Sequence, residues 1–160
     1  MKPVKQTRTG PKGNCFQACV ASVLELPLEA IPDFCNGANA DDWFQEFSKW
    51  ILRFNLSVIR IETGDMTNFL QLQHGGFLKG AYMLAGGKSA VRGVLHEVVY
   101  YGDKMVHDPA PEGKGLEGEP IDYIVFIAHN PADCALKSPI MCSNVDPYTK
   151  LLLHSSSIEE

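Results

Sequence analysis

The spacing of apolar residues changes near residue 55, and this change constrains the fold more than any other feature of the chain. From residue 42 to residue 54, tryptophan, phenylalanine and isoleucine recur at the three- and four-residue intervals of an amphipathic helix. From residue 56 onward, short runs rich in β-branched and aromatic residues alternate with glycine-containing loops, as is typical of strands. Helices followed by strands predict an α+β domain with an antiparallel sheet.

Two longer helices are expected in the first part of the chain. After an extended segment, Met1 to Thr9, Asn14 is a good N-cap for a helix that begins at Cys15 and ends before Pro27. The second helix is expected from Asp42 to Phe54. The residues expected on its buried face are Trp43, Phe47 and Trp50.

Short strands are expected to follow, and a last helix to end the chain. The predicted strands are Leu56–Glu62, Gly80–Leu84, Leu95–Tyr101, Lys104–His107 and Tyr123–Ala128. Long loops, 85–94 and 108–121, remain between strands, and loops of this length often bind a substrate. Residues Pro147 to about His154 are expected to form the last helix, within a segment 145–160 that ends in a frayed tail.

The composition is that of one ordinary globular domain spanning residues 1–160. With 45% apolar residues, the chain has enough material for a single core. Its 14 Lys and Arg residues are scattered and the net charge is −5, which argues against nucleic acid as a partner. Neither a signal-peptide pattern nor an apolar run of about 18 residues occurs, so we expect a soluble cytoplasmic protein without a membrane partner. The oligomeric state stays open.

The candidate nucleophile is a cysteine. Five cysteines are an odd number without regular spacing, so we expect reduced thiols rather than a disulfide framework. Cys15 stands at the start of the first predicted helix, where unpaired N–H groups and the helix dipole stabilise a thiolate. Cys19 follows one turn later among small apolar residues and is expected in the core.

A cysteine nucleophile needs a base within hydrogen-bonding reach, about 4 Å from sulfur to ring nitrogen, and a third group that orients the base. His96 and His107 are the histidines in predicted strands. The register of the hairpin that joins these strands decides which of them lies beside an acid. His96 is the predicted base, with Asp108 as its orienter and His107 as the alternative orienter.

This prediction depends on the length of the hairpin loop. A three-residue loop, Tyr101 to Asp103, would place His96 directly opposite Asp108 and make every facing pair chemically compatible. A two-residue Gly-Asp loop would instead place Glu97 opposite Asp108, so that like charges face each other. The sequence therefore favours the three-residue loop.

Three short segments resemble the papain-like cysteine peptidases, especially small members akin to bacteriocin-leader-processing and cell-wall-peptide peptidases and short uncharacterised phage or bacterial proteins. The segments are Gly13–Cys19 at the start of the first helix, Gly93–Val99 at the start of a strand, and Val106–Pro109 in the next strand. The resemblance implies a papain-like fold, with Cys15 as nucleophile, His96 as base and Asp108 as orienter. It also implies hydrolysis of a peptide, isopeptide or related amide bond through an acyl-enzyme.

The resemblance further implies an upstream glutamine that helps to bind the oxyanion. Gln6 is the matching candidate, with Gly10-Pro11-Lys12 apparently inserted between it and Cys15. Asn14 is the alternative.

Other kinds of site are disfavoured, and no metal or cofactor is expected. Cys15 and Cys19 lack a second pair of zinc ligands at a matching spacing, and strand neighbours such as His107 and Asp108 point to opposite faces. Gly86–Ser89 ends like a phosphate-binding loop but lacks the preceding glycine, so we interpret it as a flexible rim. The remaining alternative function is that of a non-catalytic binding protein, for example a phage-encoded inhibitor of a host protein.

Overall fold

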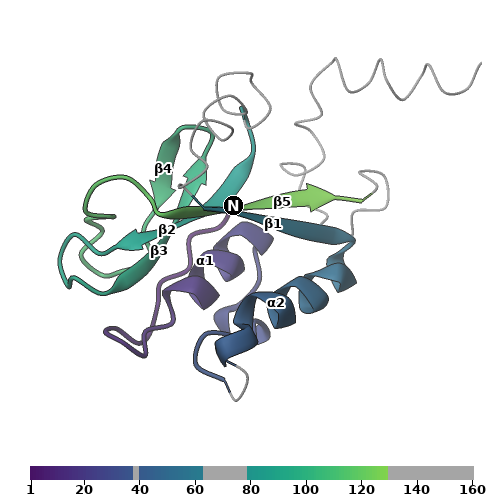
Figure 1. Ribbon diagram of the computed structural model, residues 1–160, viewed down its shortest axis with the longest axis horizontal. Helices are drawn as coiled ribbons and strands as arrows, with labels where there is room; N and C mark the ends of the chain where they lie inside the picture. Colours follow the sequence, from purple (N-terminus) through teal and green to yellow (C-terminus); the bar gives the residue numbers. More distant parts are fainter. Residues whose placement is uncertain (38–39, 63–78, 130–160) are drawn as a thin grey trace, which may run out of the picture.

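The computed structural model describes residues 1–37, 40–62 and 79–129. In these ranges, two α-helices pack on one side of a five-stranded antiparallel sheet, so the predicted α+β class is confirmed (Figure 1). The α-helices are α1 (Cys15–Leu24) and α2 (Trp43–Ile51), and the single-turn helices are η1 (Leu28–Ala30), η2 (Ala40–Asp42) and η3 (Leu52–Phe54). The strands are β1 (Leu56–Glu62), β2 (Tyr82–Lys88), β3 (Leu95–Tyr101), β4 (Lys104–His107) and β5 (Asp122–Ala128).

Helix α1 begins and ends where the sequence predicts. It starts after Asn14, and it ends at Glu25, whose φ of 57° is left-handed, just before Pro27. The cap itself differs from the prediction, because the Asn14 side chain does not accept a hydrogen bond from the backbone N–H groups at the helix start. Every residue from Ala18 to Leu24 is buried, which makes α1 the central helix of the molecule.

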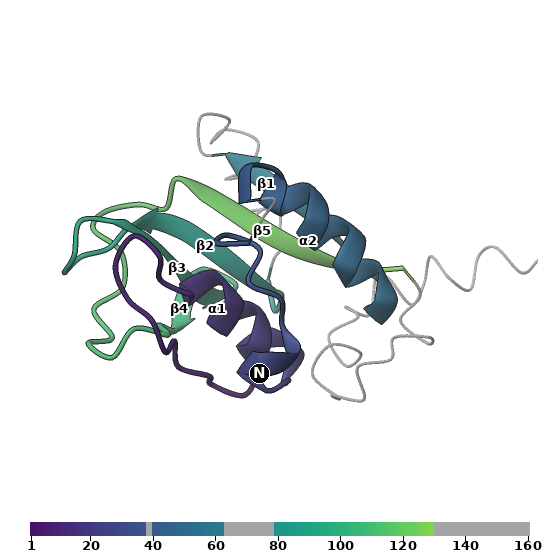
Figure 2. The same ribbon diagram turned by 90° about the horizontal axis from the view of Figure 1, so that it is seen from below.

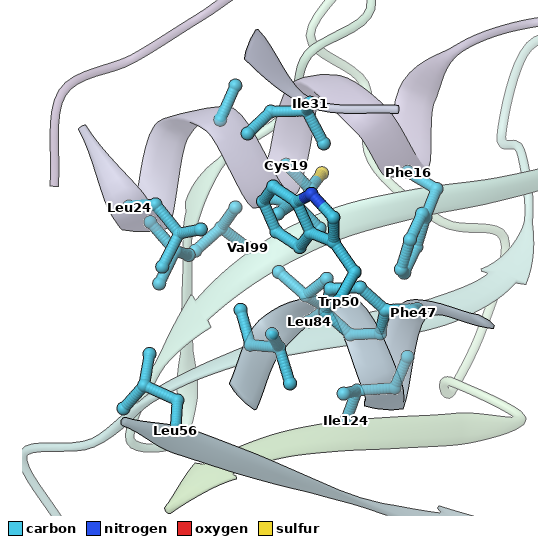
Figure 3. Close-up of a cluster of buried hydrophobic side chains, with 14 residues drawn as sticks. Phe16, Cys19, Leu24, Ile31, Phe47, Trp50, Leu56, Leu84, Val99 and Ile124 are labelled. Atoms are coloured by element: carbon cyan, nitrogen blue, oxygen red, sulfur yellow. The ribbon is translucent and has the colours of Figure 1, made fainter. Parts of the chain in front are cut away.

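Helix α2 lies alongside α1 over the sheet and closes the main core (Figure 2). Phe47 is 0% exposed, and its ring centroid lies 5.0 Å from that of Phe16 on α1 (Figure 3). Trp50 is also buried, as predicted, whereas Trp43 is only partly buried and packs edge-on against Phe16. The aromatic spacing of α2 thus marks the face that joins the helix to the rest of the core.

The strand order is β1-β5-β2-β3-β4, and β2 lies between β5 and β3. Strand β2 runs to Lys88 and so contains most of the Gly86–Ser89 segment. The interpretation of this segment as a flexible rim is therefore wrong. The predicted loop from residue 85 to 94 is shorter for the same reason. Glycine has a low strand propensity, but pairing with β3 holds Gly86 and Gly87 in the sheet, and Gly86 is paired with β5 as well.

The hairpin between β3 and β4 differs from the prediction. Its loop is the two-residue turn at Gly102, where φ is 60°, and not the three-residue loop from Tyr101 to Asp103. The observed pairs are Tyr101–Lys104, Tyr100–Met105 and Val99–His107. The register shifts between the last two pairs, so Val106 is an extra residue of a β-bulge. The bulge prevents the unfavourable pairing of Glu97 with Asp108 that a regular two-residue hairpin would impose.

The predicted terminal helix, Pro147 to His154, lies outside the described residues. Within the ranges that are described, none of the helices is long and apolar enough to cross a membrane.

The core packing of Phe47 gives a first test. Replacing Phe47 by Ala leaves a cavity between the helices and the sheet, and we expect it to lower the free energy of unfolding by about 3–5 kcal/mol. Urea unfolding followed by tryptophan fluorescence measures this change. Leu52→Ala is the control, because Leu52 is 49% exposed and its loss should cost no more than about 0.5 kcal/mol. Equal effects of the two substitutions would contradict the packing described above.

Candidate active site

Cys15 and His96 border one cavity of about 310 Å³. The cavity lies between the start of α1, the turn that precedes it, and the sheet. Its wall also includes Trp43, Arg60, Glu97 and Asp122, which come from α2, β1, β3 and β5. Side chains from both halves of the sequence therefore meet at the position where the sequence predicts a nucleophile and a base.

Two cysteines on one face of α1 contact the same residue of β3. The thiol of Cys19 donates to the carbonyl of Glu97 at 3.3 Å. The backbone of Glu97 also forms a hydrogen bond that favours the ionised form of Cys15. Because Glu97 directly follows His96, these contacts hold the start of α1 next to the predicted base. Cys19 is fully buried, as predicted, and lies in the core shown in Figure 3.

The ionisation of Cys15 differs from the expectation for a helix start. Burial, followed by the nearby negative charge of Glu97, raises the pKa of the Cys15 thiol to about 11, even though backbone hydrogen bonds from Glu97, Phe16 and Cys15 itself act in the opposite direction. The helix terminus contributes only about 0.3–1 kcal/mol at exposed sites. Desolvation of the charged sulfur outweighs this contribution, so the thiol is uncharged at neutral pH.

His96 forms a buried hydrogen bond with Asp108, and the Nε2 to Oδ1 distance is 2.8 Å. The two residues are 7% and 6% exposed, respectively. The predicted pair is thus present although the predicted register is wrong, because the bulge shifts the register by one residue and places Asp108 on the same face of the hairpin as His96. Since Nε2 faces Asp108, Nδ1 is the ring nitrogen that remains for a proton from a nucleophile.

The Asp108 carboxylate is held by backbone donors as well. Oδ1 accepts from the N–H of Ala110 and Oδ2 from the N–H of Gly115, each at 2.7 Å. Burial by itself raises the pKa of Asp108, but the hydrogen bonds from His96, Gly115 and Ala110 outweigh it and lower the pKa below its ordinary value. Asp108 is therefore ionised at neutral pH and suited to orient an imidazole.

His107, the alternative orienter, is directed elsewhere. Its Nε2 lies 2.9 Å from the carbonyl oxygen of Val4 in the N-terminal segment. It faces Val99 across the hairpin, on the opposite side of the strand from Asp108. Asp108, and not His107, forms the hydrogen bond with His96.

Neither candidate for the oxyanion donor borders the cavity. The amide group of Gln6 donates to the carbonyl of Arg8 at 2.9 Å. The Asn14 side chain accepts from the N–H groups of Thr7 and Arg8 and donates to Thr7 and Gln17. Both side chains stabilise the turn before α1, which the inserted glycine and proline residues lengthen. The backbone N–H groups at the start of α1 are the remaining donors near Cys15.

One acidic residue of the cavity wall, Glu97, was not among the site residues expected from the sequence. Burial raises the pKa of Glu97 well above its ordinary value; Asp122 raises it further, and Arg60 acts in the opposite direction. Arg60 donates to Asp122 through Nε at 2.6 Å. A signal was available in the sequence, because Glu97 is an acidic residue inside an otherwise apolar strand. In the described ranges, no group of three or more His, Cys, Asp or Glu side chains is arranged to hold a metal ion.

Comparisons of the chain with protein-family models, curated protein sequences and solved structures gave no significant match. The function is therefore inferred from the residues of the site.

The hydrogen bonds of Asp108 predict a pH-dependent stability. In Asp108→Asn, one carboxylate oxygen becomes an NH₂ group that cannot accept from Ala110 or Gly115. We expect the free energy of unfolding at pH 7 to fall by about 1–3 kcal/mol. Because the folded pKa of Asp108 is lowered, its contribution is complete above the unfolded pKa of about 3.9 and is lost as the pH falls through the folded value.

Urea unfolding of both proteins between pH 7 and pH 3 measures this effect. The difference between wild type and Asp108→Asn should shrink below about pH 4, where protonation removes the same charge from the wild type. A difference that stays constant down to pH 3 would show that charge is not the cause.

Proposed function

We propose that this protein is a papain-like cysteine hydrolase that cleaves a peptide, isopeptide or related amide bond. Cys15 is the nucleophile, His96 the base and Asp108 the residue that orients the base. The observation that carries the proposal is the buried 2.8 Å hydrogen bond between His96 and Asp108, beside a cavity that Cys15 also borders. A histidine oriented by a carboxylate next to a cysteine at a helix start is the arrangement that acyl transfer requires.

The reaction begins when Cys15 Sγ attacks the carbonyl carbon of the amide and its proton passes to His96 Nδ1. The oxyanion collapses, the C–N bond breaks, and His96 returns the proton to the leaving amine, which leaves a thioester on Cys15. A water molecule then gives a proton to His96 and attacks the thioester carbon. This second step releases a carboxylic acid and regenerates the thiol.

Cys15 does not begin the reaction as a thiolate. With a pKa of about 11, the thiol keeps its proton in the empty site, so proton transfer to His96 accompanies attack. The backbone N–H groups of the first turn of α1 are the oxyanion donors in this mechanism. Gln6 and Asn14 act indirectly, by holding the turn that positions Cys15.

The rim of the cavity supports a peptide-like substrate. Leu95 and Ile121 border the cavity and are 74% and 50% exposed, which leaves apolar surface available to side chains of a bound chain. Cys15, Cys19 and Cys35 are free thiols, which fits a reducing compartment, and we place the reaction in the cytoplasm. The local resemblance to small phage and bacterial peptidases supports the same class of reaction.

A second candidate function is a binding protein that retains the fold without turnover. The raised pKa of Cys15 and the engagement of Gln6 and Asn14 outside the cavity favour this alternative. In that case the cavity would bind part of a partner protein, and the His96–Asp108 pair would serve the structure alone.

Turnover of acyl substrates separates these functions. A panel of fluorogenic peptide amides, isopeptides and thioesters is assayed with wild type, Cys15→Ala, His96→Ala and Asp108→Ala. We expect Cys15→Ala and His96→Ala to lose at least about 10³-fold in kcat/KM, and Asp108→Ala to lose about 10²- to 10⁴-fold. His107→Ala is the matched control, because it removes a buried strand histidine whose ring bonds to the Val4 carbonyl and takes no part in the His96–Asp108 hydrogen bond. Equal rates in wild type and Cys15→Ala would leave the binding function.

Alkylation of Cys15 tests its ionisation. Only the thiolate reacts with iodoacetamide, so the rate constant should rise about tenfold per pH unit from pH 7 to pH 9.5 without a plateau. Mass spectrometry of the labelled peptides follows Cys15 and, as an internal comparison, Cys35, whose pKa burial raises to about 12. A plateau for Cys15 below about pH 8 would mean that His96 already holds it as a thiolate in the empty site.

A further inference from the structure

The wall of the cavity on the side of the sheet is built around Gly86 on β2. Gly86 lies opposite Glu97 on β3 and opposite Asp122 on β5. A Cβ atom on Gly86 would lie 2.3 Å from Asp122 Oδ1 and 3.1 Å from Glu97 Oε2. The missing side chain therefore lets two carboxyl groups approach each other across the central strand, at the border of the cavity that contains Cys15.

Within the described residues, Asp122 pairs with Arg60, whereas one oxygen of Glu97 has no hydrogen-bond partner. Arg60 donates to Asp122, pairs with Glu62 and lies over the ring of Trp43. Its guanidinium group therefore already interacts with residues other than Glu97. In contrast, Oε1 of Glu97 is buried without any hydrogen-bond partner in the described part of the chain. Buried polar atoms in native proteins nearly always have a partner. Gln6 Oε1 also has none in the described residues, but Gln6 does not border the cavity, whereas Glu97 does, and a ligand bound there could donate to Glu97.

The charges around the cavity indicate which ligand this is. The groups that face Glu97 are Asp122 on β5, Arg60 on β1 and the thiols of Cys15 and Cys35. When Glu97 and Asp122 are both ionised, their two negative charges exceed the single positive charge of Arg60 by one unit. An anionic ligand would be repelled, whereas an ammonium or guanidinium group would balance the charge and donate to Oε1.

We propose that Glu97 binds a basic side chain of the substrate, that of the residue whose carbonyl group Cys15 attacks. The basic side chain is assigned to the residue that supplies the attacked carbonyl group because Glu97 lies close to Cys15. The backbone of Glu97 hydrogen-bonds Cys15, and Glu97 lines the same cavity. The cleaved bond thus follows a lysine or arginine residue. This inference names the substrate class of the proposed hydrolase and rests on that function for its catalytic part.

Proton linkage gives the proposal a characteristic signature. In the empty site, burial and Asp122 raise the pKa of Glu97, so the carboxyl group is protonated at pH values where an exposed glutamate is ionised. A bound cation stabilises the ionised form and expels the proton to solvent. Affinity for a cationic ligand should therefore rise with pH, by up to about tenfold per unit, until the pH passes the pKa of the empty site. A neutral ligand should show no such rise.

Binding is measured first, independently of catalysis. Isothermal titration calorimetry on Cys15→Ala compares N-acetyl-lysine methylamide with N-acetyl-norleucine methylamide, which has a similar shape and no charge. At pH 8 we expect the lysine compound to bind at least about tenfold more tightly, and this preference should shrink toward pH 5. Titration in two buffers of different ionisation enthalpy should show release of up to one proton for the lysine compound alone.

Substitution of Glu97 then assigns the preference to a residue. Glu97→Gln keeps the size of the side chain but cannot ionise, and it should abolish the preference for lysine and the proton release. Glu117→Gln is the matched control, because Glu117 is an exposed acid that pairs with Lys88 away from the cavity wall. The lysine preference should survive in this control.

Catalysis is measured second, with coumarin amides of lysine and norleucine. A wild-type protein that cleaves both amides equally, without an effect of Glu97→Gln, would overturn the basic-residue site and leave the hydrolase in place. Lysine-selective binding that depends on Glu97, with no turnover of any substrate, would retain the site and overturn the hydrolase. A third outcome is that a neutral glutamine compound binds best and keeps this preference at pH 5. This result would overturn the basic-residue site and indicate that a protonated Glu97 donates to amide groups.

Discussion

The carboxylate of Asp108 is the group on which the arrangement of the site depends. It lies just after β4 and accepts hydrogen bonds from His96, Ala110 and Gly115, while its carbonyl group accepts one from Lys5. These bonds join β3, the loop after β4 and the N-terminal segment at one point. A buried carboxylate is costly unless its oxygens are hydrogen-bonded, so the loop must adopt a conformation that supplies donors. The interaction that orients His96 therefore also determines the course of the loop.

The two sides of the cavity differ in how completely their polar groups are satisfied. On one side, both oxygens of the Asp108 carboxylate are hydrogen-bonded, and one of these bonds holds His96 in one orientation. On the other side, Glu97 keeps an unpartnered oxygen beside Gly86, where only a residue without a side chain fits. A fold rarely retains such a group for stability, because an apolar residue would cost less there. In the proposed hydrolase, the first side positions the catalytic groups and the second recognises the substrate.

Much of the fold could be predicted because its signals are local. The helix from Cys15 was predictable from its cap position and from Pro27, and α2 from the spacing of Phe47 and Trp50. The extension of β2 through Gly86 was not, since hydrogen bonds from β3 and β5 override the low strand propensity of glycine. The hairpin register failed for a related reason. The register prediction compared the side chains that face each other in a regular antiparallel ladder. A bulge at Val106 breaks that regular ladder, so the comparison did not include the observed register.

The sequence by itself determined the α+β class and the position of Cys15 at the start of a helix, because each depends on spacing within a short segment. It also named His96 and Asp108 as partners, but from a hairpin register that the structure replaces with a bulge. Only the tertiary structure decided that the Cys15 thiol has a raised pKa, that Gln6 and Asn14 lie outside the cavity, and that Glu97 lies inside it. The physical reason is that burial and charge–charge interactions depend on which distant segments meet. Neighbours in the chain do not contain that information.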